Sequence, residues 1–326
     1  MVQEPTSSQL PGPVEDALSE FARWAEDKRQ QYEGAIDQPV YHYTDVAGLT
    51  GILESNKVWL TDIAHLNDPS EFTICRSIAD DALREEIDHA DAPTALFCRS
   101  MLSGLERARR AFPMFVGSFS KNGDDLGQWR AYADNARGFC IGISERVFAH
   151  TGIDDNPLKN PVVIQMSYDL SHAEHELREC VRQATNATND PQVRTCWQKS
   201  SEVGKNFLIR LSVELAKQIY FYCVCFKHPA YSAEEEIRLL LINKAEKLLP
   251  FVKTRQRRDE IVPYIPFQCS PALRDEGIVS VIRLGPAEGS STEDGLIQLL
   301  NSNGYPMSAV TTNVPIDRSE IPYRPL

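Results

Sequence analysis

The stretch YHYTDVAGLTGIL, residues 41–53, joins a strand pattern to a helix pattern and sets the fold class. The aromatic and β-branched residues of YHYT favour an extended strand. Asp45 is a residue type that caps helices, and apolar residues then recur at helical spacing to about Ser55: Val46, Leu49, Ile52 and Leu53. The alternating KVWLTD at 57–62 then predicts a second strand.

Helix and strand patterns are interleaved irregularly along the rest of the chain. Helical spacing predicts helices at about 13–34, 70–111 and 171–222, the last broken around NATNDP, and β-branched runs predict strands at 114–120, 139–143, 161–169 and in EEEIRLLLINK, IVPYIPF, GIVSVIRLGP and SAVTTNVPI. The sequence lacks the βαβ rhythm and Gly-rich turn of a dinucleotide-binding doubly wound sheet. We therefore predict an α+β fold with mixed or split β-sheets and flanking helices.

No composition shift divides the chain into separate domains. Residues 1–12 are polar and Pro-rich and predict a disordered tail. Residues 13–326 then form a single predicted α+β domain.

The charge balance and the cysteines limit the class of function. A net charge of -12 argues against a broad surface that neutralises phosphates. The basic run KTRQRRDE at 253–260 is typical of a solvated loop, with a local RNA contact as the alternative. The eight cysteines show no CxxC or Cys/His spacing suited to zinc, so we expect reduced thiols and no metal site. No apolar run approaches the ~20 residues of a membrane span, which predicts a cytoplasmic protein without a membrane partner.

Three polar stretches could carry chemistry. His42 lies in YHYT, with Thr44 two residues on and on the same strand face. Ser118 and Ser120 share a face at the end of a strand that opens SFSKNGDDLGQWRAYA. Each has an ordinary structural alternative, because a lone histidine in a strand is often a core residue and paired serines often form turns.

The third stretch is KHPAYSAEEEIRLL, in which Glu234 and Glu236 can point to one side if the chain is extended. A run of glutamates is usually a solvated face. Here the run ends abruptly against apolar IRLLLI, so we expect Glu236 to begin a strand, partly buried at a sheet edge, with Arg238 as its ion-pair partner. Trp129 and Tyr132 are more typical of core aromatics than of a ligand platform.

Five blocks of the sequence resemble, in order, the motifs of the bacterial domain-of-unknown-function family numbered 2971. The blocks are YHYTDVAGLTGILESNKVWLTDIAHLNDPSEF, GSFSKNGDDLGQWRAYADNARGFCIGI, KHPAYSAEEEIRLL, IVPYIPF and SEIPYR. The resemblance runs from about residue 39 to residue 326. It indicates kinship, whereas the activity of that family is mostly unassigned.

The order of these motifs is similar, more remotely, to that of the ADP-ribosyltransferase superfamily. The similarity implies an ADP-ribosyltransferase-like core in which His42 holds a ribose of NAD. Ser118 with Ser120 would then match the second motif, and Glu234 with Glu236 the third. The histidine class of that superfamily usually carries a Tyr motif, and the Ser-x-Ser pair belongs to the arginine class, so the chain would be a hybrid.

The implied activity is the transfer of ADP-ribose from NAD, the substrate, to a protein, RNA or DNA acceptor, or the hydrolysis of NAD. The resemblance further implies a defence or toxin-like role in bacteria. Glu236 would stabilise the oxocarbenium-like transition state, and Glu234 and Glu235 remain alternatives. The NAD-binding set would include, besides His42 and the serines, the side chains Thr44, Trp129, Tyr132 and Arg238.

Two other interpretations remain open. The first is a non-catalytic sensor module that holds a nucleotide in the same place, and the second is a plain α+β scaffold. Asn67, Asp68 and Glu71 of LNDPSE match no motif of the superfamily and could form a site of their own. The oligomeric state is not predicted. One geometric condition applies to the enzyme: if His42 and Glu236 lie on opposite sides of the sheet, the proposed catalysis fails.

Overall fold

The computed structural model describes residues 10–34, 36–66, 69–148, 158, 161–257, 259–268, 278–287, 291–305 and 314–324. The chain divides into two compact units that alternate along the sequence. Unit 1 comprises Met1–Tyr32, Asp68–Phe112 and Ser167–His228, and unit 2 comprises Glu33–Asn67, Pro113–Met166 and Pro229–Leu326. Because each unit draws on three separate segments, no single position in the sequence marks a boundary. The single domain over 13–326 stays a prediction.

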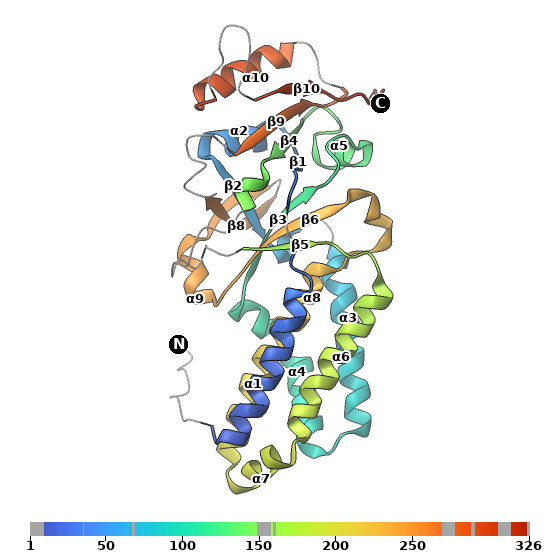
Figure 1. Ribbon diagram of the computed structural model, residues 1–326, viewed down its shortest axis with the longest axis vertical. Helices are drawn as coiled ribbons and strands as arrows, with labels where there is room; N and C mark the ends of the chain where they lie inside the picture. Colours follow the sequence, from blue (N-terminus) through green and yellow to red (C-terminus); the bar gives the residue numbers. More distant parts are fainter. Residues whose placement is uncertain are drawn as a thin grey trace. The chain divides into compact units, whose positions relative to one another are not determined.

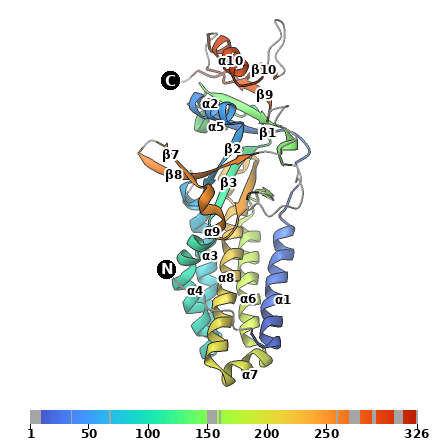
Figure 2. The same ribbon diagram turned by 90° about the vertical axis from the view of Figure 1, so that its left-hand side faces the viewer.

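The described elements of unit 1 are helices. They are α1 (Gly12–Gln30), α3 (Pro69–His89), α4 (Ala92–Ala111), α6 (Leu170–Asn189), α7 (Pro191–Lys199) and α8 (Ser201–Cys225). Helix α8 packs against the other five, and its residues 218–225 are all buried, as expected of a central helix. Figures 1 and 2 show α1, α3, α4, α6 and α8 running side by side. None of the described helices is long and apolar enough to cross a membrane.

These helices confirm the three predicted helical regions. The break expected at NATNDP lies between α6 and α7, where Asp190 caps α7 by accepting hydrogen bonds from the Gln192 and Val193 amides. Helix α1 begins at Gly12, and Leu10 is already buried, so the end of the predicted tail is ordered. Residues 1–9 of that tail lie outside the described part of the chain.

Unit 2 contains one mixed, open β-sheet. Its described strands are β1 (Val40–Thr44), β2 (Lys57–Asp62), β3 (Met114–Ser120), β4 (Phe139–Ile143), β5 (Val162–Gln165), β6 (Glu236–Ile242), β7 (Lys253–Arg257), β8 (Glu260–Gln268), β9 (Val279–Leu284) and β10 (Ile316–Arg318). The order is β10-β9-β4-β1-β3-β2-β8-β7, and β6 joins β3 to β5. Only β10 and β9 pair in parallel among these strands. The predicted α+β class with a mixed sheet and flanking helices is therefore confirmed.

The sheet divides at β3, which pairs with three strands. Strand β6 pairs along its whole length, β1 pairs with it at Ser120, and β2 pairs with it at Phe115 and Val116. Strands β1 and β2 thus border β3 at different ends, and no pairing joins them within the described residues. The separation of β1 from β2 along β3 is the physical origin of the split sheet that we expected from the sequence.

Different helices cover the two faces of the sheet. On one face, α2 (Val46–Ser55) and α10 (Ser291–Ser302) pack on the main apolar core, to which β1, β3 and β6 contribute Val40, Phe119 and Ile237. We call this the core face. On the other face, α5 (Leu126–Tyr132) packs on Tyr43 and Cys140 through Trp129. We call this the α5 face.

Two predicted elements differ from the structure. Residues 253–257 of KTRQRRDE, expected as a solvated loop, form the strand β7 at the end of the sheet order, paired with β8. Cross-strand pairing overrides the weak strand propensity of this charged segment. The strand expected at SAVTTNVPI falls mostly on residues outside the described part, and the strand β10 begins at its last residue, Ile316.

Candidate functional site

Strand register separates the predicted catalytic residues into two groups. Tyr41 pairs with Ser120, and Ser120 pairs with Glu236, so these three side chains share the α5 face. His42 follows Tyr41 and therefore points to the core face. Its ring lies 6.0 Å from the ring of Phe119, a core-face residue, which agrees with this assignment. His42 and Glu236 thus lie on opposite sides of the sheet.

The expected single cleft of His42, the serines and Glu236 is therefore not formed. The tyrosines that flank His42 share a face with Ser120 and Glu236, whereas we expected the histidine to lie there. The physical reason is that side chains alternate along a strand, so register with the neighbouring strands decides which residue faces a given partner.

His42 has a defined role at the division of the sheet. Its Nδ1 lies 3.1 Å from the main-chain oxygen of Ser118 in β3. Because a carbonyl oxygen only accepts, Nδ1 carries the proton, and Nε2 of the neutral ring is an acceptor. Burial lowers the pKa of His42, the Ser118 carbonyl opposes this shift, and the positive charge of Arg255 adds to it. His42 is thus a neutral, oriented imidazole near physiological pH.

Thr44 shares the core face with His42 but is buried in packing. The Cβ of an alanine in place of Gly48 in α2 would lie 1.9 Å from Thr44 Oγ1, which shows how closely the strand and the helix approach. At 8 % exposure, Thr44 has little surface to offer a ligand.

Glu236 and Arg238 form the predicted ion pair on the α5 face. Arg238 Nε donates to Glu236 Oε1 at 2.8 Å, and Arg238 Nη2 lies 3.3 Å from Oε2. Both side chains are buried, as is Ser120, whose Oγ accepts a hydrogen bond from the Asn122 amide at 3.0 Å. Half-buried Ser118 is aligned with Arg238. Strand β6 lies between β3 and β5, so Glu236 is not at a sheet edge as expected.

The glutamate triplet is bent, so its carboxylates do not share one extended face. Glu234 ends a short 3-10 helix, Pro229–Glu234, and Glu235 has a φ of 44°, in the left-handed region. The expectation that Glu234 and Glu236 point to one side assumed an extended chain. Glu234 is half-buried and accepts a hydrogen bond from the Tyr132 hydroxyl at 3.0 Å.

Trp129 is a core residue on this face. It is fully buried, and its ring lies edge-on to Tyr43 with 4.9 Å between centroids. Its Nε1 donates to Asp124 Oδ1 at 2.7 Å. Trp129 therefore packs in the core, the role that we favoured for it from the sequence.

Asp124 was missed by the sequence analysis although it lies in the quoted block GSFSKNGDDLGQW. Besides Trp129, it accepts hydrogen bonds from the Ser319 hydroxyl at 2.6 Å and the Glu320 amide at 3.0 Å. Tyr43 in turn donates to the Asn122 carbonyl. The turn that carries Asn122 and Asp124 therefore joins three of the five blocks, those around YHYT, SFSKNGDD and SEIPYR, and Asp124 makes the link to SEIPYR. An aspartate that follows Asn-Gly just before a helix is the signal that could have identified it.

A second group of missed residues surrounds Arg255. Its guanidinium lies 5.2 Å from the ring centroid of Trp59 and 5.6 Å from that of Tyr264, and Nη2 donates to Thr61 Oγ1 at 3.0 Å. We call these four residues the Arg255 cluster. Arg255, Trp59 and Tyr264 are all half-buried. Within the described part of the chain, Arg255 forms no ion pair with a carboxylate.

The Arg255 cluster packs on α2 and acts electrostatically on His42, although register places Thr61 of the cluster on the α5 face, opposite His42. The positive charge of Arg255 contributes to the lowered pKa of His42, and Asp45 at the start of α2 acts on Arg255 electrostatically. The Trp59 ring lies against Gly51 of α2, where a Cβ would approach it to 2.8 Å. This rigid packing holds the indole, and through it the guanidinium, in place.

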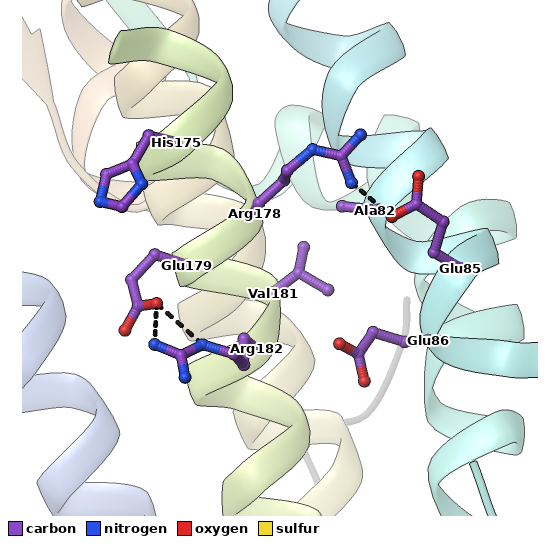
Figure 3. A pocket seen from close by; sticks show the side chains of 8 residues that line it. All are labelled: Ala82, Glu85, Glu86, His175, Arg178, Glu179, Val181 and Arg182. Atoms are coloured by element: carbon purple, nitrogen blue, oxygen red, sulfur yellow. Dashed lines mark hydrogen bonds and ion pairs between the residues drawn. The ribbon is translucent and has the colours of Figure 1, made fainter. Parts of the chain in front are cut away.

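A hollow of about 230 Å³ lies in unit 1, between α3 and α6 (Figure 3). Its lining is charged, but the charges compensate one another: Arg178 pairs with Glu85, and Arg182 pairs with Glu179. None of the predicted site residues lines it. The described part of the chain contains no group of three or more His, Cys, Asp or Glu side chains placed to hold a metal ion.

The comparison with family models gave one finding that bears on kinship. Residues 128–239 match the model described as Protein of unknown function (DUF2971). The predicted resemblance to this family is confirmed. The matched segment is shorter than the expected 39–326; it contains Trp129, Glu234, Glu236 and Arg238 but not His42.

No curated protein and no solved structure matched the chain. The similarity to the ADP-ribosyltransferase superfamily therefore stays a prediction. Asn67 and Asp68 of LNDPSE lie outside the described residues, and the side chain of Glu71 is likewise not described. The separate site suggested for them also stays a prediction.

Proposed function

We propose that unit 2 of this DUF2971-related chain is a nucleotide-binding module, which the sequence left open as the non-catalytic alternative to an NAD-dependent transferase. The observation that carries the proposal is the setting of Arg255. Its guanidinium is held by two aromatic rings and the Thr61 hydroxyl, and it has no carboxylate partner among the described residues. A guanidinium binds phosphate through paired hydrogen bonds, and one held in place loses little conformational entropy on binding.

The aromatic rings beside Arg255 support a nucleotide rather than a simple anion as the ligand. Trp59 and Tyr264 share a strand face with Arg255 and are half-buried, so the exposed part of a ring can stack on a base while the guanidinium holds a phosphate. His42 does not belong to this site, because the register partner of Thr61, Val116, lies on the α5 face and His42 lies on the core face.

Transfer of ADP-ribose is less well supported by this geometry. The reaction needs a carboxylate in contact with the ribose as positive charge develops on it. The Glu236 carboxylate is buried, receives Arg238, and lies on the sheet face opposite His42. NAD turnover, a protein or nucleic-acid acceptor and a role in defence stay predictions that follow from the resemblance alone.

Calorimetric titration of the full-length chain with ADP-ribose and with NAD tests the proposal. We expect saturable binding that weakens about tenfold or more in Arg255→Gln, because one charge-assisted phosphate contact is lost. Lys247→Ala, which removes an exposed lysine from α9 (Ala245–Leu248) of the same unit, should bind like the unchanged chain. Absence of binding by the unchanged chain would overturn the proposal.

A parallel incubation with NAD separates binding from turnover. We expect no release of nicotinamide, with or without cell lysate. Release that disappears in both Glu236→Gln and His42→Ala would instead establish the transferase or glycohydrolase activity and would overturn the non-catalytic assignment.

A further inference from the structure

Strands β2, β8 and β7 present a basic and aromatic surface on one face. Register pairs Thr61 with Tyr264 and Tyr264 with Lys253, and alternation adds the residues two positions away on each strand. The rings of Trp59 and Tyr264 are 4.9 Å apart, and Arg255 lies against both, which confirms that these side chains share a face. We call it the hairpin face; its charged and aromatic members are Lys57, Trp59, Lys253, Arg255, Arg257, Glu260 and Tyr264.

This surface is positive on a chain whose net charge is -12. Arg257 is compensated by Glu260, its register partner, at 3.0 Å. Lys57, Lys253 and Arg255 form no ion pair with another described residue. A local excess of positive charge therefore remains beside the two rings, and it is complementary to a polyanion rather than to the rest of this acidic protein.

The spacing and position of the positive groups suit an extended chain of phosphates. Alternate residues on a strand lie about 7 Å apart, so Lys253 and Arg255 can contact successive phosphates of an extended single strand. Strand β7 is the last in the sheet order, and Figure 2 shows the β7–β8 hairpin standing out from the other strands. Lys253 is exposed, and Tyr264 is half-buried and offers part of its ring for stacking of a base.

We propose that the hairpin face binds single-stranded nucleic acid, with one nucleotide at Arg255 and neighbouring phosphates at Lys253 and Lys57. The proposal rests on the proposed nucleotide-binding function, since Arg255 is the receptor in both. Phosphates and base faces are common to RNA and DNA, so the surface recognises the single strand rather than its sugar.

Binding of a short, labelled oligoadenylate RNA to the full-length chain, measured by fluorescence anisotropy over a range of salt concentrations, tests this proposal. We expect affinity to fall with salt, with a logarithmic slope of about 0.7 for each phosphate contacted. Lys253→Ala should weaken RNA binding and reduce this slope by about one such step. Lys247→Ala, an exposed lysine outside the hairpin face, is the matched control and should leave both unchanged.

Stacking is tested separately. Tyr264→Leu, which keeps an apolar side chain in the sheet, should weaken RNA binding about tenfold through loss of a stacked base. The single-stranded DNA of the same sequence should bind about as well as the RNA, because both offer phosphates and base faces. Equal binding of the RNA and of an acidic polyglutamate peptide would overturn the proposal.

Comparison with ADP-ribose distinguishes the two proposals. If ADP-ribose binds through Arg255 but RNA binds no better than a mononucleotide, or Lys253→Ala behaves like Lys247→Ala, the single-strand proposal fails and the nucleotide-binding function stands. If neither ligand binds, both fail. Circular dichroism of each variant must show the unchanged helix content, so that loss of binding is not loss of folding.

Discussion

Arg238 Nε donates to Glu236 Oε1 at 2.8 Å, and the two side chains are only 2 % and 6 % exposed. Removing one partner of such a buried pair leaves the other charge without compensation. We therefore expect Arg238→Met to lower the free energy of unfolding by about 3–5 kcal/mol. Urea unfolding of the full-length chain, followed by circular dichroism, measures this change.

Two further variants identify the cause of that loss. The double variant Glu236→Leu with Arg238→Met removes both charges, and it should recover much of the stability that Arg238→Met loses. Glu235→Gln, at the exposed neighbour, should change the free energy of unfolding by no more than about 0.5 kcal/mol. A small effect of Arg238→Met, equal to that of Glu235→Gln, would contradict a stabilising role for the pair.

Local structure around the opening motif follows closely from the sequence. Asp45 caps α2 by accepting a hydrogen bond from the Gly48 amide at 2.8 Å, and Leu49, Ile52 and Leu53 are buried as their spacing predicts. The apolar pattern after the glutamates likewise predicted burial of Glu236 and its pairing with Arg238. These features depend on residues a few positions apart, whose relative placement the helix or strand geometry fixes.

The arrangement of the candidate site depends on register between distant strands, which no local pattern contains. Strand alternation places His42 and Thr44 together, but only the pairing of Tyr41 with Ser120 and of Ser120 with Glu236 shows that they face away from Glu236. A shift of one residue in either pairing would reverse that result. The Arg255 cluster was not predicted for the same reason, because its members come from three strands, β2, β7 and β8, and meet only through their register.

The lowered pKa of His42 predicts a dependence of stability on pH. Burial disfavours the protonated ring, so the unfolded chain, with a pKa of about 6.5, binds the proton more readily. The contribution of His42 to stability is therefore complete above about pH 6.5 and is lost as the pH falls through the lowered pKa. We therefore expect the free energy of unfolding to fall as the pH is lowered from about 7 to about 5.

His42→Asn should weaken that dependence, because the amide can donate to the Ser118 carbonyl but does not titrate. Unfolding in urea at a series of pH values makes the comparison. His89→Asn, at an exposed histidine in α3, controls for removal of an imidazole. Parallel pH profiles for the unchanged chain and His42→Asn would contradict the assigned environment.

Asp124 predicts a second pH effect, in the acid range. Burial raises its pKa, but the hydrogen bonds from Ser319, Trp129 and Glu320 and the charge of Arg283 together lower it below the usual value. Its contribution to stability is therefore present above about pH 3.9 and is lost as the pH falls through the lowered pKa. Asp124→Asn should cost about 1–2 kcal/mol at neutral pH, and less in acid.

The measurement is the difference in free energy of unfolding between Asp124→Asn and the unchanged chain, from neutral pH into the acid range. Asp37→Asn, at an exposed position of unit 2, corrects for the loss of one negative charge. A difference that stays constant or grows in acid would show that the carboxylate is not the stabilised form.

Tyr43 tests whether the tyrosines beside His42 differ in their roles. Its hydroxyl donates to the Asn122 carbonyl at 2.8 Å and accepts from the Asp125 amide at 2.9 Å, and the residue is 5 % exposed. Tyr43→Phe leaves both backbone groups without this partner, so we expect a loss of about 1–3 kcal/mol in the free energy of unfolding.

Tyr41→Phe is the matched control on the same strand face. Its ring packs on Gly123 and is half-buried, and packing survives the loss of the hydroxyl. Urea unfolding should therefore separate the two variants, and equal losses would show that Tyr43 stabilises the loop by its ring alone.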